Sequence, residues 1–188
     1  MKDRAGKWEK FDGQAEKYYP AATFELFHAT TAVHVISAVQ TLLIAGFVVI
    51  YFAMEAHGFF ILKNYFRLVV ASVATLYLAG IVAAVFGAYL ERRHFLNIQI
   101  LVLRSLMLFA DIIALAIILI MAIGNRQKWI EAIPTHFVNA KQFYGLLGPF
   151  WMYLGAISLH ITVAGNMVFQ KVINGCIKYF EDKEQAEA

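Results

Sequence analysis

The sequence predicts an all-α membrane protein, a polytopic bundle of four transmembrane helices with both termini in the cytosol. Of its 188 residues, 61% are hydrophobic and 15% are charged, and a soluble domain of this size cannot place so many apolar side chains inside. The apolar residues form four blocks of roughly 20 residues, the length that crosses a hydrocarbon core. Eleven Lys and Arg residues flank these blocks on one side and five on the other, and such residues favour the cytosolic side.

The first 31 residues are predicted to be a cytosolic segment, because they are polar and lack the apolar core of a signal peptide. From Lys7 to Tyr19 the aromatic residues fall close to helical spacing, with Lys and Glu between them. This spacing predicts a short helix that lies on the inner membrane surface and ends at Pro20. A frayed polar tail is the alternative interpretation.

Four spans are predicted at about residues 32–54, 68–90, 104–123 and 148–170, which together form one membrane domain. The apolar run that holds the third span is 30 residues long, from Phe95 to Gly124. As a helix it measures about 45 Å, longer than a hydrocarbon core of roughly 30 Å, so residues 95–103 are expected to project from the membrane. Residues 171–188 are predicted to be a polar cytosolic tail.

The loop 125–147 is predicted to lie on the side opposite the termini. The single cysteine, Cys176, excludes a disulfide within the chain, and no Asn-x-Ser/Thr sequence offers a glycosylation site. We expect a multi-pass protein of the endoplasmic reticulum or another endomembrane rather than of the plasma membrane.

Three polar side chains fall within the predicted spans at similar depth. Gln40 and His160 lie roughly 12–15 Å from the inner boundary, and Asp111 lies about 10 Å from it. We expect them to form one polar layer between the helices, with Asp111 buried and paired with His160, Gln40 or a residue of another subunit. Such a layer could hold the helices together, carry protons or ions, or bind a partner subunit.

The second span carries small residues at every fourth position, a pattern that lets another helix approach closely. This small-residue ladder consists of Ala71, Thr75, Ala79, Ala83 and Gly87. The partner helix could belong to the same bundle or to another subunit.

Three arginines form a basic rim at the predicted inner boundary: Arg92, Arg93 and Arg104. Guanidinium groups bind phosphates with two hydrogen bonds, so the rim could hold lipid head groups. The ordinary excess of basic residues on the cytosolic side explains the same arginines.

The sequence shows none of the motifs that commonly indicate a catalytic site. No phosphate-binding loop, nucleophile–base pair or metal-binding cluster appears, and Arg104 stands alone, whereas a voltage sensor repeats its basic residues. A haem held by two histidines needs matched depths, but His34 and His160 differ by about 10 Å. We therefore expect no enzymatic activity, no cofactor, no metal and no nucleic-acid partner.

The layout of four spans, two cytosolic termini, a short first outer loop and a longer second one resembles MARVEL-like and lysosome-associated four-span membrane proteins. The chain lacks the loop cysteines of the occludin and synaptogyrin-like branches. The resemblance implies roles in membrane organisation, trafficking or the support of other subunits, and it assigns no residue.

Three functions follow as hypotheses. The leading one is a non-catalytic accessory or scaffold subunit of a larger membrane complex, which packs through small-residue helix faces. The second is a lipid-handling component that binds or transfers phospholipid. The third is a small oligomeric channel or transporter. Expected partners are membrane lipids and other integral membrane proteins.

Overall fold

A computed structural model describes residues 11–23, 25–124 and 132–187, and these are mostly helical. The long helices are α1 (Ala29–Ala56), α2 (Lys63–Tyr89), α3 (Arg93–Gly124) and α6 (Trp151–Glu187). By length and composition, all four are suited to cross a membrane. The all-α class is therefore confirmed for the described residues, with four helices long and apolar enough to span a membrane.

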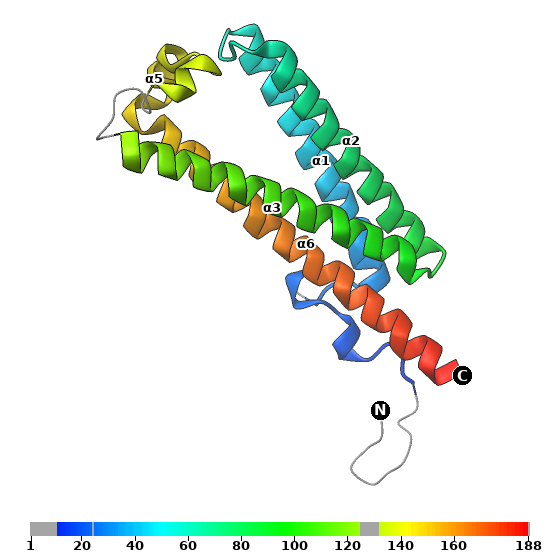
Figure 1. The fold of residues 1–188 in the computed structure, drawn as a ribbon. Helices are drawn as coiled ribbons and strands as arrows, with labels where there is room; N and C mark the ends of the chain where they lie inside the picture. Colours follow the sequence, from blue (N-terminus) through cyan, green and yellow to red (C-terminus); the bar gives the residue numbers. More distant parts are fainter. Residues whose placement is uncertain (1–10, 24, 125–131, 188) are drawn as a thin grey trace.

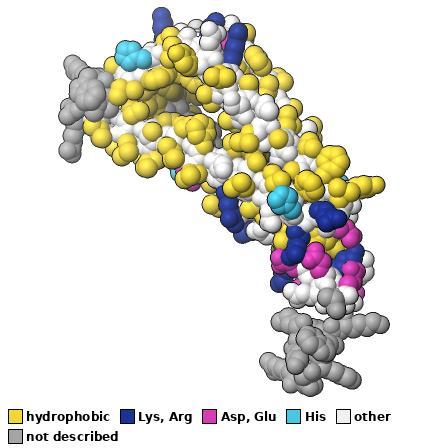
Figure 2. Space-filling model, turned by 45° about the vertical axis from the view of Figure 1, so that its right-hand side comes forward, with side chains coloured by type: hydrophobic (Ala, Val, Ile, Leu, Met, Phe, Trp, Pro, Cys, Tyr) yellow, Lys and Arg dark blue, Asp and Glu magenta, His cyan; other side chains and the backbone are white. Residues whose placement is uncertain are grey.

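The long helices form two pairs, α1 with α2 and α3 with α6 (Figure 1). The pairs meet where α2 leads into α3, and they diverge toward the opposite end of the molecule. We call the end where they meet the junction and the diverging parts the arms. Hydrophobic side chains cover much of the arms, whereas charged side chains gather near the end of α6 (Figure 2).

Loops connect the two arms at the end opposite the junction. The backbone N–H of Asn139 donates to the carbonyl of Phe59 at 2.8 Å, beside an isolated bridge between Phe60 and Val138. The Phe143 ring stacks on Trp151 at 5.0 Å and packs edge-on against Phe59 at 4.9 Å. The short elements of this loop are η3 (Ile133–His136), α5 (Ala140–Leu147) and η4 (Gly148–Phe150).

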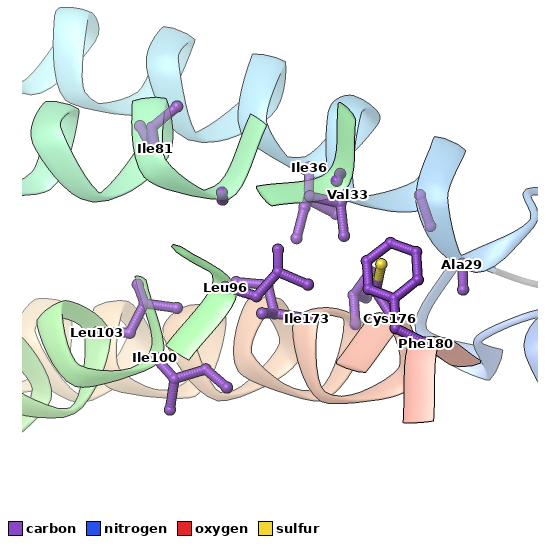
Figure 3. Close-up of a cluster of buried hydrophobic side chains, with 14 of the residues drawn as sticks. Ala29, Val33, Ile36, Ile81, Leu96, Ile100, Leu103, Ile173, Cys176 and Phe180 are labelled. Atoms are coloured by element: carbon purple, nitrogen blue, oxygen red, sulfur yellow. The ribbon is translucent and has the colours of Figure 1, made fainter. Parts of the chain in front are cut away.

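The main hydrophobic core lies at the junction (Figure 3). The first half of α1, the last turns of α2, the first turns of α3 and the second half of α6 all contribute to it. Its members include Val33, Ile81, Leu96, Leu103 and Ile173. The fold is thus consolidated mainly at one end.

The segment 171–188, expected as a polar tail, is instead the second half of α6 as far as Glu187. Val172, Ile173, Cys176 and Phe180 are at most 2% exposed and recur at helical spacing, so they form one face in the core. Similarly, α3 begins at Arg93 as one continuous helix, and residues 95–103 carry core side chains such as Leu96 and Leu103.

The N-terminal segment lies along the second half of α6. Of the expected helix over residues 7–19, residues 7–10 lie outside the described part, and the rest contains only the 3-10 turn η1 (Glu16–Tyr18). A second turn, η2 (Ala21–Thr23), follows. The ring of Tyr18 packs edge-on against Tyr179 at 5.0 Å, so aromatic groups expected on a membrane surface contact α6 instead.

Candidate functional site

Each of the four long helices contributes one polar side chain to a layer at the junction. Gln99 Nε2 of α3 donates to Gln40 Oε1 of α1 at 3.3 Å, and Tyr77 Oη of α2 donates to Asn166 Oδ1 of α6 at 2.9 Å. All four residues are at most 8% exposed. Neutral hydrogen bonds between buried groups fix how the helices meet, so this junction layer sets the relative positions of the two pairs.

The layer depends on a close approach between α2 and α3 at Gly80. A Cβ atom at this glycine would lie 1.9 Å from Gln99 Oε1 and 3.2 Å from the Cβ of Val102. Any other residue at this position would require the buried amide of Gln99 to move. The layer is also incompletely paired, because Gln40 Nε2 and Gln99 Oε1 are buried without a hydrogen-bond partner among the described residues, as is Ser37 Oγ about one helical turn before Gln40.

The predicted layer of Gln40, Asp111 and His160 is not formed. Gln40 lies in the junction layer, whereas Asp111 and His160 are exposed on α3 and α6. Asp111 makes no hydrogen bond or ion pair with any described residue, and the expected burial of its side chain between helices of this chain is not found. The reason is helical phase: the faces that meet at the junction carry Gln99 and Asn166 instead.

Asp111 and His160 nevertheless lie at similar heights along the α3–α6 pair. Val163 packs in one cluster with Met107 and Ala110. The Gln170 amide oxygen, turned toward Arg104, accepts from its Nε and Nη2 at 3.1 and 3.2 Å. This antiparallel register places Asp111 level with Val163 and His160 three residues further along. The axial offset between the two polar residues is about 4.5 Å.

A groove runs along this side of α3 and α6. It is an open depression of about 460 Å³, lined by Ile118, Tyr153, Ala156, Ile157, His160, Ile161 and Ala164. Asp111 precedes Ile118 by two helical turns on the same face of α3. We call this surface the α3–α6 groove. The Nδ1–H of His160 donates to the carbonyl of Ala156 at 2.8 Å, which leaves Nε2 of the neutral ring as an acceptor.

The small-residue ladder of α2 divides between two environments. Gly87 is buried, and a Cβ there would lie 3.0 Å from the backbone nitrogen of Leu96 on α3. Ala83 is half-buried, and the other three members, Ala71, Thr75 and Ala79, are exposed. The helices of this chain pack instead on the neighbouring small residues Gly80, Ala84 and Ala88.

The basic rim is partly neutralised within the chain. Arg93 forms ion pairs with Glu181 and Glu184 of α6, at 3.3 and 2.8 Å. Arg104 is bonded to Gln170, and the exposed side chain of Arg92 contacts no acidic group among the described residues. Two of the three guanidinium groups thus already have partners in α6.

An ion pair at the other end of the molecule was not anticipated from the sequence. Arg67 Nε of α2 donates to both carboxylate oxygens of Glu55 on α1, at 3.0 and 3.1 Å, and Glu55 is buried. The two residues lie 12 positions apart in the sequence, on either side of the α1–α2 loop. Their opposite charges near the ends of two consecutive helices are the sequence feature that could have indicated this pair. The pair joins α1 to α2 at the tip of their arm.

Within the described ranges, no group of three or more His, Cys, Asp or Glu side chains is placed to hold a metal ion. Comparisons with family models, curated proteins and solved structures give no match to this chain.

Proposed function

We propose that this chain is a multi-pass membrane protein with cytosolic termini that acts as a non-catalytic accessory or scaffold subunit of a larger membrane complex, in the endoplasmic reticulum or another endomembrane. The observation that carries the proposal is the exposed part of the small-residue ladder on α2. These three residues face away from the chain's own core and remain available to another helix.

The geometry of α2 shows why. Ala84 is 1% exposed and marks the side of α2 that packs within the chain. At 100° per residue, Thr75 points to the opposite side, and Ala71 and Ala79 lie about 40° to either side of Thr75. In a bilayer, small residues on such a face let a second backbone approach closely enough for van der Waals packing to hold it. A helix that only contacted lipid would not need them.

Substitutions at two alanines of α2 separate this role from packing within the chain. We expect Ala79→Leu to remove co-purifying membrane proteins, because leucine blocks close approach on the exposed face, while the thermal unfolding midpoint stays unchanged. The matched control, Ala84→Leu, should lower the midpoint, because its side chain enters the core. The measurements are mass spectrometry of proteins purified in mild detergent and thermal unfolding of the same preparations. An unchanged set of proteins in the Ala79→Leu preparation would contradict the proposal.

One observation favours the second hypothesis, lipid handling. The stripe of α1 that is buried at Val33, Ile36 and Gln40 continues at helical spacing through Leu43, Phe47 and Ile50. These three apolar side chains are 57%, 49% and 61% exposed, because the arms diverge beyond Gln40. Acyl chains would cover this surface. Lipid that co-purifies at a fixed ratio to the protein in both the Ala79→Leu and Ala84→Leu preparations, without any co-purifying protein, would support lipid handling over the accessory role.

A further inference from the structure

Asp111 occupies an unfavourable position for a carboxyl group in a transmembrane helix. Within the predicted span 104–123 it lies seven residues after the inner end and 12 before the outer end, or about 10 and 18 Å along the helix. Neither distance lets so short a side chain reach the membrane surface. Its exposure on a helix that spans the bilayer would place the group in hydrocarbon, where an ionised carboxylate is very costly without a partner.

The polar groups at the height of Asp111 on the α3–α6 pair indicate what such a partner must supply. An ionised carboxylate only accepts hydrogen bonds, and the free Nε2 of His160 is also an acceptor, since its Nδ1–H is used by Ala156. Apart from the Tyr153 hydroxyl, the other side chains that line the α3–α6 groove are apolar, and Ala156 and Ala164 leave room for a helix backbone to approach. The groove therefore offers negative charge and acceptors within an apolar surface.

We propose that the α3–α6 groove binds a transmembrane helix of another membrane protein, and that a Lys or Arg side chain of this helix pairs with Asp111 and donates to His160. The inference rests on the proposed accessory function and names the chemistry of one partner. The cation and the carboxylate neutralise one another at a depth where neither is stable alone. The aliphatic groove side chains pack against the rest of the partner helix.

A second copy of this chain is a poor source of that cation. Arg104 is the one Lys or Arg in the four predicted spans. It lies seven residues before Asp111, about 10 Å closer to the inner boundary, and is bonded to Gln170. A copy inserted in the same orientation would bring its own Asp111 to this depth, so two like charges would meet. The partner is therefore a different chain.

Synthetic helices test the proposal with defined probes. Polyleucine transmembrane peptides carrying a central Lys, a central Arg or Leu throughout are labelled with a fluorescent acceptor. The full-length protein, with a donor at its C terminus, is reconstituted with each peptide in phosphatidylcholine vesicles. We expect energy transfer to report association about tenfold stronger for the Lys and Arg peptides than for the all-Leu peptide. Asp111→Asn, which preserves shape, should abolish this preference, and His160→Ala should reduce it.

Exchanging the charges between the protein and the peptide distinguishes loss of the ion pair from general disruption of the groove. Asp111→Lys should prefer a peptide with a central Asp over the Lys peptide. The proposal is overturned if the Lys, Arg and all-Leu peptides associate equally, if Asp111→Asn keeps the preference, or if Asp111 instead drives energy transfer between two copies of this chain. Ala79→Leu should leave peptide binding unchanged, since α2 lies apart from the groove. If the peptide-binding test fails, the result of the Ala79→Leu co-purification test is unaffected, and failure of the co-purification test likewise leaves the peptide-binding result unaffected.

Discussion

At Gly80 a single hydrogen atom in place of a methyl group determines how closely α2 and α3 approach. We expect Gly80→Ala to lower the free energy of unfolding by about 1–3 kcal/mol, because the new Cβ would overlap Gln99 Oε1 and force the junction layer apart. Gly165→Ala is the matched control in a helix interior, since no described atom beyond its chain neighbours and its own helix backbone lies within 4 Å of a Cβ built there. Thermal unfolding in detergent compares the two. Equal midpoints would show that the layer adapts without cost.

At the same scale, the sequence could identify polar residues within the spans but not which of them meet. Gln40 lies between helices but bonds to Gln99, which fell within the stretch expected to project from the membrane. Asn166 and Tyr77 enter the layer only through the phase of α6 and α2 relative to their neighbours. A one-residue difference in phase turns a side chain by about 100°, which separates the buried Ala110 from the exposed Asp111.

Among the elements, the N-terminal segment is held to α6 by charges as well as by aromatic rings. Asp182 accepts from Lys17 Nζ at 3.0 Å and from Tyr18 Oη at 2.8 Å. Burial raises the pKa of Asp182, but these two hydrogen bonds outweigh it and leave the pKa below its usual value. Hydrogen bonds to Tyr18 and Asp182 raise the pKa of Lys17.

The signs of these shifts define a pH window. A lowered carboxyl pKa gives stabilisation that is complete above about pH 4 and is lost as the pH falls further. A raised Lys pKa gives stabilisation that persists below about pH 10 and is lost at higher pH. We therefore expect the segment to stay on α6 from about pH 5 to pH 9. Spin labels at Glu16→Cys and Gln185→Cys report the distance between the N-terminal segment and the last turns of α6.

Asp182→Asn is the control for this titration. It should weaken docking by less than about 1 kcal/mol, because Lys17 is half exposed and its ion pair is screened by solvent. It should also remove the acid-induced release. Release of the segment with a midpoint near neutral pH would contradict the assignment to Asp182.

Element boundaries were predictable where composition changes sharply and not where it changes gradually. The beginning and end of α2 follow from Arg67 and from the charged residues after Leu90, within a few positions. The second half of α6 averages as polar because Glu, Asp and Lys occupy its outer face. Its buried residues, from Val172 to Phe180, become recognisable as a core stripe once the junction is known to extend beyond the apolar blocks.

For the whole molecule, the distribution of Lys and Arg makes the orientation testable. We expect both termini in the cytosol, because the side of the membrane that holds the termini carries the excess of Lys and Arg, and such residues favour the cytosolic side. A tag at residue 2 and a cysteine introduced at Asn139 should react with membrane-impermeant reagents from opposite sides of sealed vesicles. Labelling of both sites from the same side would contradict this topology. Cys176 is buried and should contribute little background.

Because the core lies at one end, a small rotation at the junction would produce a large displacement at the far ends of the arms. From Gln40 to the end of α1 is 16 residues, so the free part of that arm is about 24 Å long. A rotation of 10° at the junction would move its tip by about 4 Å, while core side chains near the pivot would shift only slightly. Contacts of Phe59 and Phe143 at the tips oppose that rotation with the greatest leverage. The aromatic contacts at the tips therefore act together with the junction layer to hold the two helix pairs at their spacing.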